Sequence, residues 1–216
     1  MIKTIKASKS EKILFIFLIG LSIFTFTSFF LLKNKCLFVE KNNLSRFNFN
    51  EPNNIAVMNV ECGNVIIELY PDISPKAVER FKILIEQKMY DGSAFYKVSE
   101  NTFVQAGDIE YGNINNLDYS KIGSGKSGLG LLKSELSNDF KFTKGSVGFA
   151  RTAEFNTEDS EFFITLKEIP IYQGEYTPIG KVVYGLDILT KIKTGNKAIY
   201  VLRPDYIKTF RMFNSN

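Results

Sequence analysis

Hydrophobic residues follow three different patterns along this chain. Residues 13–32 form an unbroken apolar run, ILFIFLIGLSIFTFTSFFLL, which carries no charge. Residues 33–54 are polar and rich in Asn and Lys. From Ile55 onward, short apolar runs alternate with Gly, Asn and Asp, a pattern typical of β-strands joined by turns. The sequence therefore predicts a basic N-terminal segment (1–12), an apolar segment (13–32), a polar linker (33–54) and one β-rich domain (55–216).

The apolar segment has the length of a transmembrane helix. At a rise of ~1.5 Å per residue, about 20 residues span the ~30 Å hydrocarbon core of a bilayer. Lysines precede the segment, as they do in a secretory signal, but no small-residue cleavage site comes after it. We therefore favour an uncleaved single-pass anchor over a cleaved signal. Lysines flank both sides, so the positive-inside rule does not fix the orientation.

Because short N-terminal anchors of this kind commonly export the domain attached to them, we expect the domain on the extracytoplasmic, periplasmic side of the membrane. The polar linker is interpreted as a flexible tether between the anchor and the domain.

The β-rich domain opens with a predicted hairpin, since apolar strands flank Cys62, Gly63 and Asn64. Ser74 and Pro75 then mark the start of an amphipathic helix that continues to about Lys88. Further strands are expected at 94–98, 103–106, 146–150, 162–166, 179–183 and 207–212, and a second helix at 186–192. Many short strands with two helices fit a closed antiparallel barrel capped by the helices. A β-sandwich fits the same pattern.

Composition narrows the possible chemistry. The chain has no histidine and two cysteines, Cys36 and Cys62, which excludes the usual zinc sites and the Ser-His and Cys-His nucleophile pairs. The spacing of the cysteines indicates no disulfide framework, so we expect two free thiols. The sequence therefore gives no reason to expect a metal or another cofactor.

Charge and glycine content argue against two other functions. The net charge of +4 comes from scattered lysines, without the basic stripe that nucleic-acid binding requires. The Gly-rich stretch 123–130, GSGKSGLG, resembles part of a phosphate-binding loop. The first glycine of such a loop would fall at position 120, just before the stretch, and that position is Ser120. We expect neither a nucleic acid nor a nucleotide as a partner.

Several motifs resemble those of the cyclophilin-type peptidyl-prolyl cis-trans isomerases. FYKVSENTFVQAGD (95–108) is similar to the family stretch F-H-R-V-I-P-x-F-x-x-Q-G-G-D, with identical spacing. KGSVGFARTAEFNTEDSEFFIT (144–165) resembles G-x-x-S-M-A-R-T-x-x-P-N-S-x-x-S-Q-F-F-I, and YTPIGKVVYGLDILTKI (176–192) resembles Y-T-V-F-G-x-V-V-x-G-x-D-V-V-x-K-I. The resemblance covers roughly residues 56–213. It implies an eight-stranded antiparallel barrel with two helices that acts on proline-containing polypeptides.

The resemblance also implies a set of site residues. The catalytic positions fall on Lys97, in place of the family arginine, and on Gln105. The substrate-binding positions fall on Phe95, Tyr96, Phe103, Ala150, Arg151, Glu161, Phe163, Ile171, Tyr172 and Tyr176. Of the neighbouring aromatic residues, Phe149 and Phe162 are interpreted as core residues of the barrel.

Lys97 is the departure that matters most, because lysine keeps the charge of arginine but loses its planar fork of donors. We expect a reduced rate. Glu161 replaces a family glutamine, and we expect it to pair with Lys97 and hold that side chain away from the substrate. Ile171 replaces a tryptophan and Thr102 a phenylalanine. These changes leave open an alternative function, a cyclophilin-like module that binds proline peptides without catalysis.

Overall fold

The computed structural model describes residues 8–33, 35–37, 39, 43–195 and 200–213. The chain divides into two compact units, Met1–Phe38 and Val39–Asn216. Part of the predicted basic segment (1–7) and part of the predicted linker (34, 38 and 40–42) lie outside the described residues.

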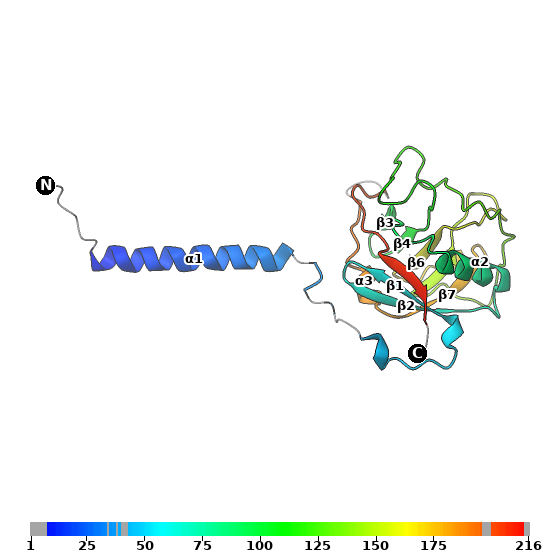
Figure 1. The fold of residues 1–216 in the computed structure, drawn as a ribbon, viewed down its shortest axis with the longest axis horizontal. Coiled ribbons are helices and arrows are strands. Elements are labelled where there is room, and N and C mark those ends of the chain that lie inside the picture. Colours follow the sequence, from blue (N-terminus) through cyan, green and yellow to red (C-terminus); the bar gives the residue numbers. More distant parts are fainter. Residues whose placement is uncertain (1–7, 34, 38, 40–42, 196–199, 214–216) are drawn as a thin grey trace. The chain divides into compact units, whose positions relative to one another are not determined.

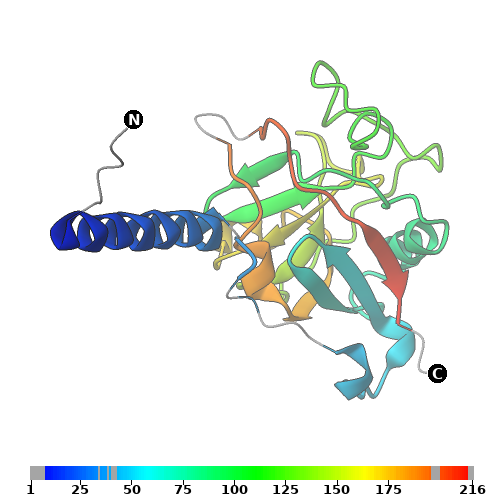
Figure 2. The same cartoon turned by 60° about the vertical axis from the view of Figure 1, so that its left-hand side comes forward.

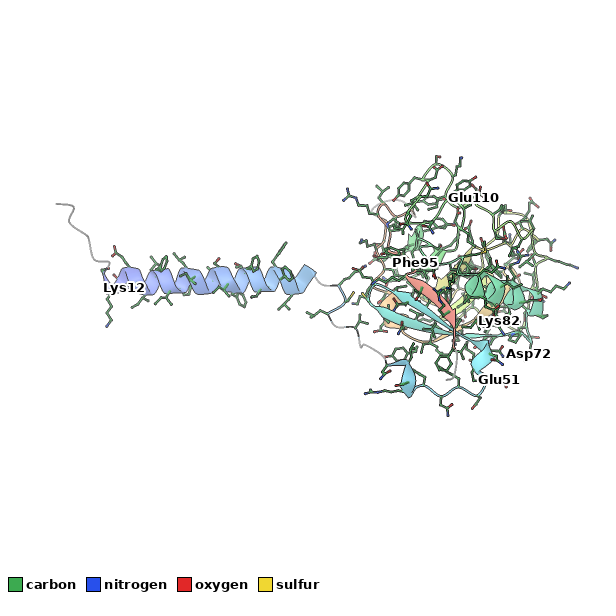
Figure 3. All side chains as sticks on the ribbon, viewed as in Figure 1. Lys12, Glu51, Asp72, Lys82, Phe95 and Glu110 are labelled. Atoms are coloured by element: carbon green, nitrogen blue, oxygen red, sulfur yellow. The ribbon has the colours of Figure 1, made fainter. Side chains whose placement is uncertain are left out.

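Helix α1 (Lys9–Lys33) contains the apolar segment. It begins with a reciprocal cap, in which Ser8 Oγ accepts from the Glu11 N–H at 3.2 Å and Glu11 Oε2 accepts from the Ser8 N–H at 2.6 Å. Side chains project from all around the helix (Figure 3). The hydroxyls of Thr25 and Thr27 donate to helix carbonyls at 3.0 and 2.9 Å, so these polar groups are satisfied within the helix.

Among the described residues, α1 alone is long and apolar enough to cross a membrane, with a mean hydropathy of 2.4 over Lys9–Leu31. A signal sequence near an N-terminus has the same length and composition, so the helix fits both interpretations of the apolar segment.

The second unit is built on one eight-stranded antiparallel sheet, shown in two views in Figures 1 and 2. Along the chain the strands are β1 (Ile55–Val60), β2 (Gly63–Leu69), β3 (Lys97–Ser99), β4 (Phe103–Ala106), β5 (Ser146–Phe149), β6 (Phe162–Thr165), β7 (Pro178–Tyr184) and β8 (Thr209–Met212). Their order across the sheet is β3-β4-β6-β5-β7-β2-β1-β8. The helices are α2 (Pro75–Glu86) and α3 (Leu186–Leu189), with short 3-10 turns at Leu44–Arg46, Pro52–Asn54 and Pro170–Tyr172.

The sheet is an open, curled half-barrel rather than the expected closed barrel. Its outer strands, β3 and β8, do not pair with each other. Within the described residues, the segment before β8 instead meets the chain around β3 through isolated bridges, Ala94 with Tyr206 and Lys97 with Tyr200. Pro204 lies inside that segment and offers no N–H to a strand ladder, which is a physical reason for the gap.

Several predicted elements differ in their bounds. The strand expected at 94–98 is observed at Lys97–Ser99, and the strand expected at 207–212 begins at Thr209. Val60 pairs with Gly63, so the hairpin turns at Glu61 and Cys62, earlier than expected. The second helix ends at Leu189 rather than at residue 192. The amphipathic helix, β4 and most of the remaining strands lie where the sequence pattern predicts them.

The core lies between α2 and the concave side of the sheet. Phe81 of α2 packs edge-on against Phe149, Phe162 and Phe210, with ring centroids 5.9, 5.2 and 5.6 Å away. All four rings are fully buried. The interpretation of Phe149 and Phe162 as core residues is confirmed.

The expectation of two free thiols is wrong, because Cys36 and Cys62 are both disulfide-bonded. A disulfide requires its two Cα atoms to lie within about 7 Å of each other. Sequence spacing does not reveal that distance in a fold built from long-range contacts.

The end of the predicted linker packs on the domain and is not the flexible tether that was expected. Phe47 packs edge-on against Tyr184 at 5.0 Å, and Phe49 packs in the same way against Phe213 at 5.1 Å. The rings of Phe47 and Phe49 stack on each other at 5.8 Å. The segment therefore adds an aromatic layer to the outside of the sheet.

We expect the double substitution Phe47→Ala and Phe49→Ala to lower the free energy of unfolding by roughly 1–3 kcal/mol, because each aromatic pair contributes about 0.5–1.5 kcal/mol beyond its buried area. Urea unfolding followed by fluorescence would measure the loss. The matched control is Leu202→Ala, which removes an exposed side chain and should change the stability by less than about 0.5 kcal/mol. Equal stability of the double variant and the control would show that the segment is a free tether.

Candidate active site

The register of four strands places the predicted catalytic positions in one row. Lys97 of β3 lies directly opposite Gln105 of β4, Gln105 lies opposite Phe163 of β6, and Phe163 lies opposite Gly148 of β5. Successive residues of a strand point to opposite faces. The alternate row, which contains Val104, Ile164 and other aliphatic residues, is buried in the core, so the row of Lys97 and Gln105 faces outward.

A cleft of about 320 Å³ opens beside this row. The predicted site residues that line it are Tyr96, Lys97, Gln105, Ala150, Arg151 and Glu161. Gly123, Ser124, Gly125 and Lys126 of the Gly-rich stretch also line it.

Tyr96, Gln105 and Glu161 form one hydrogen-bonded group in the cleft. Gln105 Nε2 donates to the Tyr96 hydroxyl at 2.6 Å and to Glu161 Oε2 at 2.8 Å. The Tyr96 hydroxyl donates to the same carboxylate oxygen. Tyr96 and Gln105 are buried and Glu161 is half-buried, so these bonds replace water that the groups lose.

The environment of this group perturbs two pKa values. Burial raises the pKa of the Glu161 carboxyl; the charge of Asp108 adds to the rise, whereas hydrogen bonds from Tyr96 and Gln105 and the charge of Lys126 oppose it. Burial, followed by the charge of Glu161, raises the pKa of the Tyr96 phenol well above its usual range. Tyr96 therefore stays protonated and remains a donor to Glu161.

Lys97 does not form the expected ion pair with Glu161. Its ammonium lies 5.9 Å from the centroid of the Phe103 ring, within the range of a cation–π contact. No ion pair joins Lys97 to a carboxylate in the part of the chain that the structure describes. Lys97 is half-buried at the edge of the cleft, and the carboxylate that was expected to hold it is engaged by Tyr96 and Gln105 instead.

An aromatic cluster adjoins the cleft. Phe163, only 3% exposed, has Tyr176 at 5.2 Å, Tyr172 at 5.3 Å and Phe142 at 5.7 Å between ring centroids. A Cβ on Gly148 would lie 2.7 Å from the Phe163 ring and 2.9 Å from Phe142. Gly148 is thus required for both rings to lie against the sheet. Sequence reasoning missed Phe142 and Gly148, although Gly148 occupies the position of a serine in the family motif.

Arg151 joins the cleft to the aromatic cluster. Its guanidinium lies 4.9 Å from the Tyr176 centroid and 4.2 Å from that of Phe155, and it pairs with Glu175 at 3.2 Å. The side chain is only 8% exposed. These contacts fix Arg151, and Ala150 before it also lines the cleft.

Two buried carboxylates hold the Gly-rich wall of the cleft. Asp108 accepts from the N–H groups of Gly123 and Gly125 at 2.6 and 3.2 Å. Asp159 accepts from the Ser127 N–H at 2.8 Å and pairs with Arg80 of α2 at 3.2 Å. A Cβ on Gly125 would lie 2.0 Å from an Asp108 oxygen. Gly123 and Gly125 therefore serve to build the wall, and the Asp108 carboxylate accepts hydrogen bonds from their amides.

Six predicted site residues do not line the cleft: Phe163, Tyr172 and Tyr176 form the adjoining aromatic cluster, and the others are Phe95, Phe103 and Ile171. Phe95 is fully buried, and its backbone N–H donates to the Asp205 carbonyl at 2.8 Å. Ile171 is 77% exposed in the turn before Tyr172 and does not line the cleft. Phe103 takes part only through its contact with Lys97.

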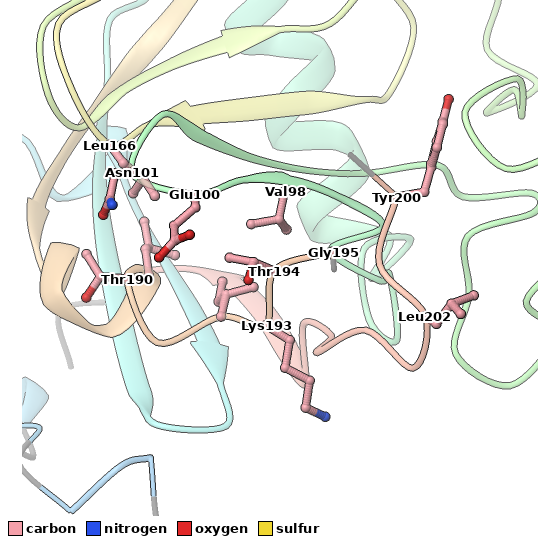
Figure 4. A pocket seen from close by; sticks show the side chains of 12 residues that line it. Val98, Glu100, Asn101, Leu166, Thr190, Lys193, Thr194, Gly195, Tyr200 and Leu202 are labelled. Atoms are coloured by element: carbon pink, nitrogen blue, oxygen red, sulfur yellow. The ribbon is translucent and has the colours of Figure 1, made fainter. Parts of the chain in front are cut away.

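A larger pocket of about 840 Å³ lies elsewhere (Figure 4). Val98, Leu166, Leu189 and Ile192 contribute its apolar lining. Val98 points to the face of β3 opposite that of Lys97, so this pocket does not share the outward row. Within the described residues, no group of three or more Cys, Asp or Glu is placed to hold a metal ion.

Comparison with known proteins identifies the family. The family model for cyclophilin type peptidyl-prolyl cis-trans isomerases matches residues 55–211. The chain belongs to this family. It is 38% identical over 149 residues to a probable peptidyl-prolyl cis-trans isomerase of Brucella suis, covering 68% of this chain and 76% of that protein.

Solved cyclophilins share the fold. A cyclophilin type isomerase from Cryptosporidium parvum, solved in the presence of the dipeptide Ala-Pro, superposes with a TM-score of 0.64 and 25% identity, covering 75% of this chain and 99% of that one. The cyclophilin AquaCyp293 from Hirschia baltica gives a TM-score of 0.62 at 20% identity, covering 74% of each chain. The cyclophilin fold and the isomerase activity implied by the sequence motifs are thus confirmed.

The raised pKa of Glu161 predicts a pH dependence of stability. The folded protein holds the Glu161 proton to a higher pH than the unfolded chain, in which the pKa is about 4.5. The contribution of this group to stability is therefore fully present below about pH 4.5 and is lost as the pH rises through the folded pKa. We expect this decline to be absent in Glu161→Gln.

Urea unfolding of the wild type and Glu161→Gln from pH 4 to pH 8 would measure the effect as the difference between the two proteins, which cancels the other titrating groups. The control is Glu154→Gln, an exposed position, which should track the wild-type profile. A wild-type profile parallel to that of Glu161→Gln would contradict the prediction.

Proposed function

We propose that this cyclophilin isomerises X-Pro bonds in polypeptides on the extracytoplasmic side of a membrane, to which residues 13–32 anchor it. The proposal rests chiefly on one arrangement, in which Lys97 and Gln105 lie opposite each other beside a cleft and an aromatic cluster. The cyclophilin solved in the presence of Ala-Pro supports a proline-containing peptide as the substrate.

The reaction requires few catalytic groups. Rotation about an X-Pro amide has a barrier of ~18–20 kcal/mol, whereas the two isomers differ by only ~0.5–1 kcal/mol. A hydrogen bond donated to the prolyl nitrogen opposes amide resonance and lowers the barrier to rotation. The bond turns without being broken, so neither a nucleophile nor a proton acceptor is needed.

Lys97 is the donor in this proposal. Its ammonium carries three N–H groups and lies at the edge of the cleft, held over the Phe103 ring by a contact of about 0.5–1 kcal/mol. The substrate can therefore displace Lys97 from the ring at small cost. A lysine lacks the fixed fork of the family arginine, so it spends less time in the productive geometry.

The proline ring binds against aromatic side chains. Tyr172 and Tyr176, both half-buried, pack on the buried Phe163 ring next to the cleft, and Arg151 contacts Tyr176. Phe142 packs on the same Phe163 ring, with 5.7 Å between the ring centroids.

The extracytoplasmic location is supported by two observations. Helix α1 has the length and hydropathy of a membrane span. Both cysteines are disulfide-bonded, and disulfides form and persist mainly in oxidising compartments outside the cytoplasm. Clients in this location would be exported polypeptides that fold after translocation, and the isomerase would assist that folding.

We expect Lys97→Arg to raise kcat/KM on a proline tetrapeptide by at least about tenfold, because one misplaced transition-state donor costs roughly 10²- to 10³-fold. Lys97→Met should reduce the rate to near background. The control Lys208→Arg changes an exposed lysine that does not line the cleft, and it should leave the rate unchanged. A protease-coupled or NMR exchange assay would measure all four proteins.

If the wild type and Lys97→Arg both bind the peptide but neither accelerates its isomerisation, the domain is a binding module and the catalytic proposal fails. Circular dichroism of each variant would confirm that the fold is unchanged.

The location has its own test. In bacterial cells that express the full chain, we expect the protein in carbonate-washed membranes, and we expect added protease to digest the domain once the outer membrane is permeabilised. A maleimide should label the cysteines only after reduction. Recovery in the soluble fraction, protection until the inner membrane is lysed, or labelling without a reductant would each overturn the location.

A further inference from the structure

The hydrogen-bonded group in the cleft has an unusual composition for this site. The family motifs have histidine at position 96 and glutamine at position 161, whereas this chain has Tyr96 and Glu161. Both replacements contact Gln105, the residue expected to hold the substrate backbone. The two changes therefore act on one side-chain amide.

Counting the protons of this group determines the orientation of the amide. A phenol has one proton, and Tyr96 donates its proton to Glu161. The oxygen of Tyr96 can then only accept, and an ionised carboxylate can only accept. Gln105 must turn its NH₂ group toward both oxygens, at 2.6 and 2.8 Å, because its carbonyl would otherwise face two acceptors. Both amide protons of Gln105 are thereby used.

Only the carbonyl oxygen Oε1 of Gln105 is left for a ligand. No described residue donates a hydrogen bond to it. Within the described part of the chain, every fully buried side-chain polar atom has a partner, so this unbonded oxygen must reach solvent. Gln105 lines the cleft, and the cleft is where its free oxygen meets solvent.

We propose that Glu161, together with Tyr96, is a positioning residue that fixes Gln105 as a pure hydrogen-bond acceptor, so that the cleft selects a backbone N–H of the substrate. The inference rests on the proposed function, because it concerns how the isomerase holds a proline-containing chain. Neither Glu161 nor Tyr96 needs to touch the substrate for this effect.

The selection has a consequence for substrate sequence. Proline has no N–H, so the backbone N–H that donates to the Gln105 oxygen comes from a residue flanking the X-Pro bond. A substrate with a second proline at that position leaves the Gln105 oxygen without a donor in a desolvated cleft, which costs affinity. The cleft therefore disfavours a substrate that has a second proline at the position whose N–H would otherwise bond Gln105.

Peptides in which one backbone amide at a time is replaced by an ester would test the selection, because an ester removes the N–H without adding bulk. Binding to the wild type, measured by calorimetry, should weaken about two- to tenfold for one ester of the series. The same ester should cost little in Glu161→Leu, which frees the Gln105 amide to turn. Glu161→Gln retains an acceptor oxygen and should restore the wild-type discrimination.

A control for general loss of stability is Tyr90→Phe, which removes a buried hydroxyl that donates to the Ser160 carbonyl at 2.8 Å and not to Gln105. It should preserve the ester discrimination despite any loss of stability. Equal ester effects in the wild type and Glu161→Leu, or no ester effect in the wild type, would overturn the inference.

A second measurement does not depend on substrate binding. The side-chain NH₂ protons of Gln105, assigned by their loss in Gln105→Met, should exchange slowly with water in the wild type and in Glu161→Gln, and rapidly in Glu161→Leu. Rapid exchange in the wild type would refute the fixed amide. If the exchange result holds but the parent peptide does not bind, the proposed function fails, whereas the fixed orientation of Gln105 stands.

Discussion

The antiparallel register of β3, β4, β6 and β5 is the constraint on which the site depends. It aligns Lys97, Gln105, Phe163 and Gly148 in one outward row, and it aligns the aliphatic residues between them in the core. A slip of one residue in any of these strands would exchange the two rows. The buried row thus specifies the position of the functional row, and core packing and site geometry are set by the same hydrogen bonds.

A second constraint is the half-buried carboxylate of Glu161. A charge removed from water must be compensated by hydrogen bonds or opposite charges. Here Tyr96 and Gln105 supply the bonds, and Lys97, the proposed catalytic donor, lies over the Phe103 ring. The carboxylate that replaces a neutral glutamine is therefore compensated by the neighbouring polar groups, and it does not hold the donor proposed for catalysis.

Much of the fold could be predicted from the sequence, because the information was local. The helical spacing of Phe81 and Leu84, the apolar runs of β1 and β2 and the ordered motifs around Gln105 and Phe163 correspond to elements in the structure. The predictions that failed concern pairs of residues far apart in the chain. They include the bonding of both cysteines, the pairing of Lys97 with Glu161 and the closure of the barrel.

The sequence by itself determined the order of the strands along the chain, the apolar N-terminal segment and which residue types occupy the positions proposed for catalysis, since each can be read from periodicity, composition or motif spacing. Only the tertiary structure decided which partner each polar group takes. Glu161 had Lys97 and Lys126 as candidate cations, and Tyr96 and Gln105 as candidate donors. The choice among them depends on distances of a few ångströms set by packing of the whole sheet, and these distances are not encoded in any single segment.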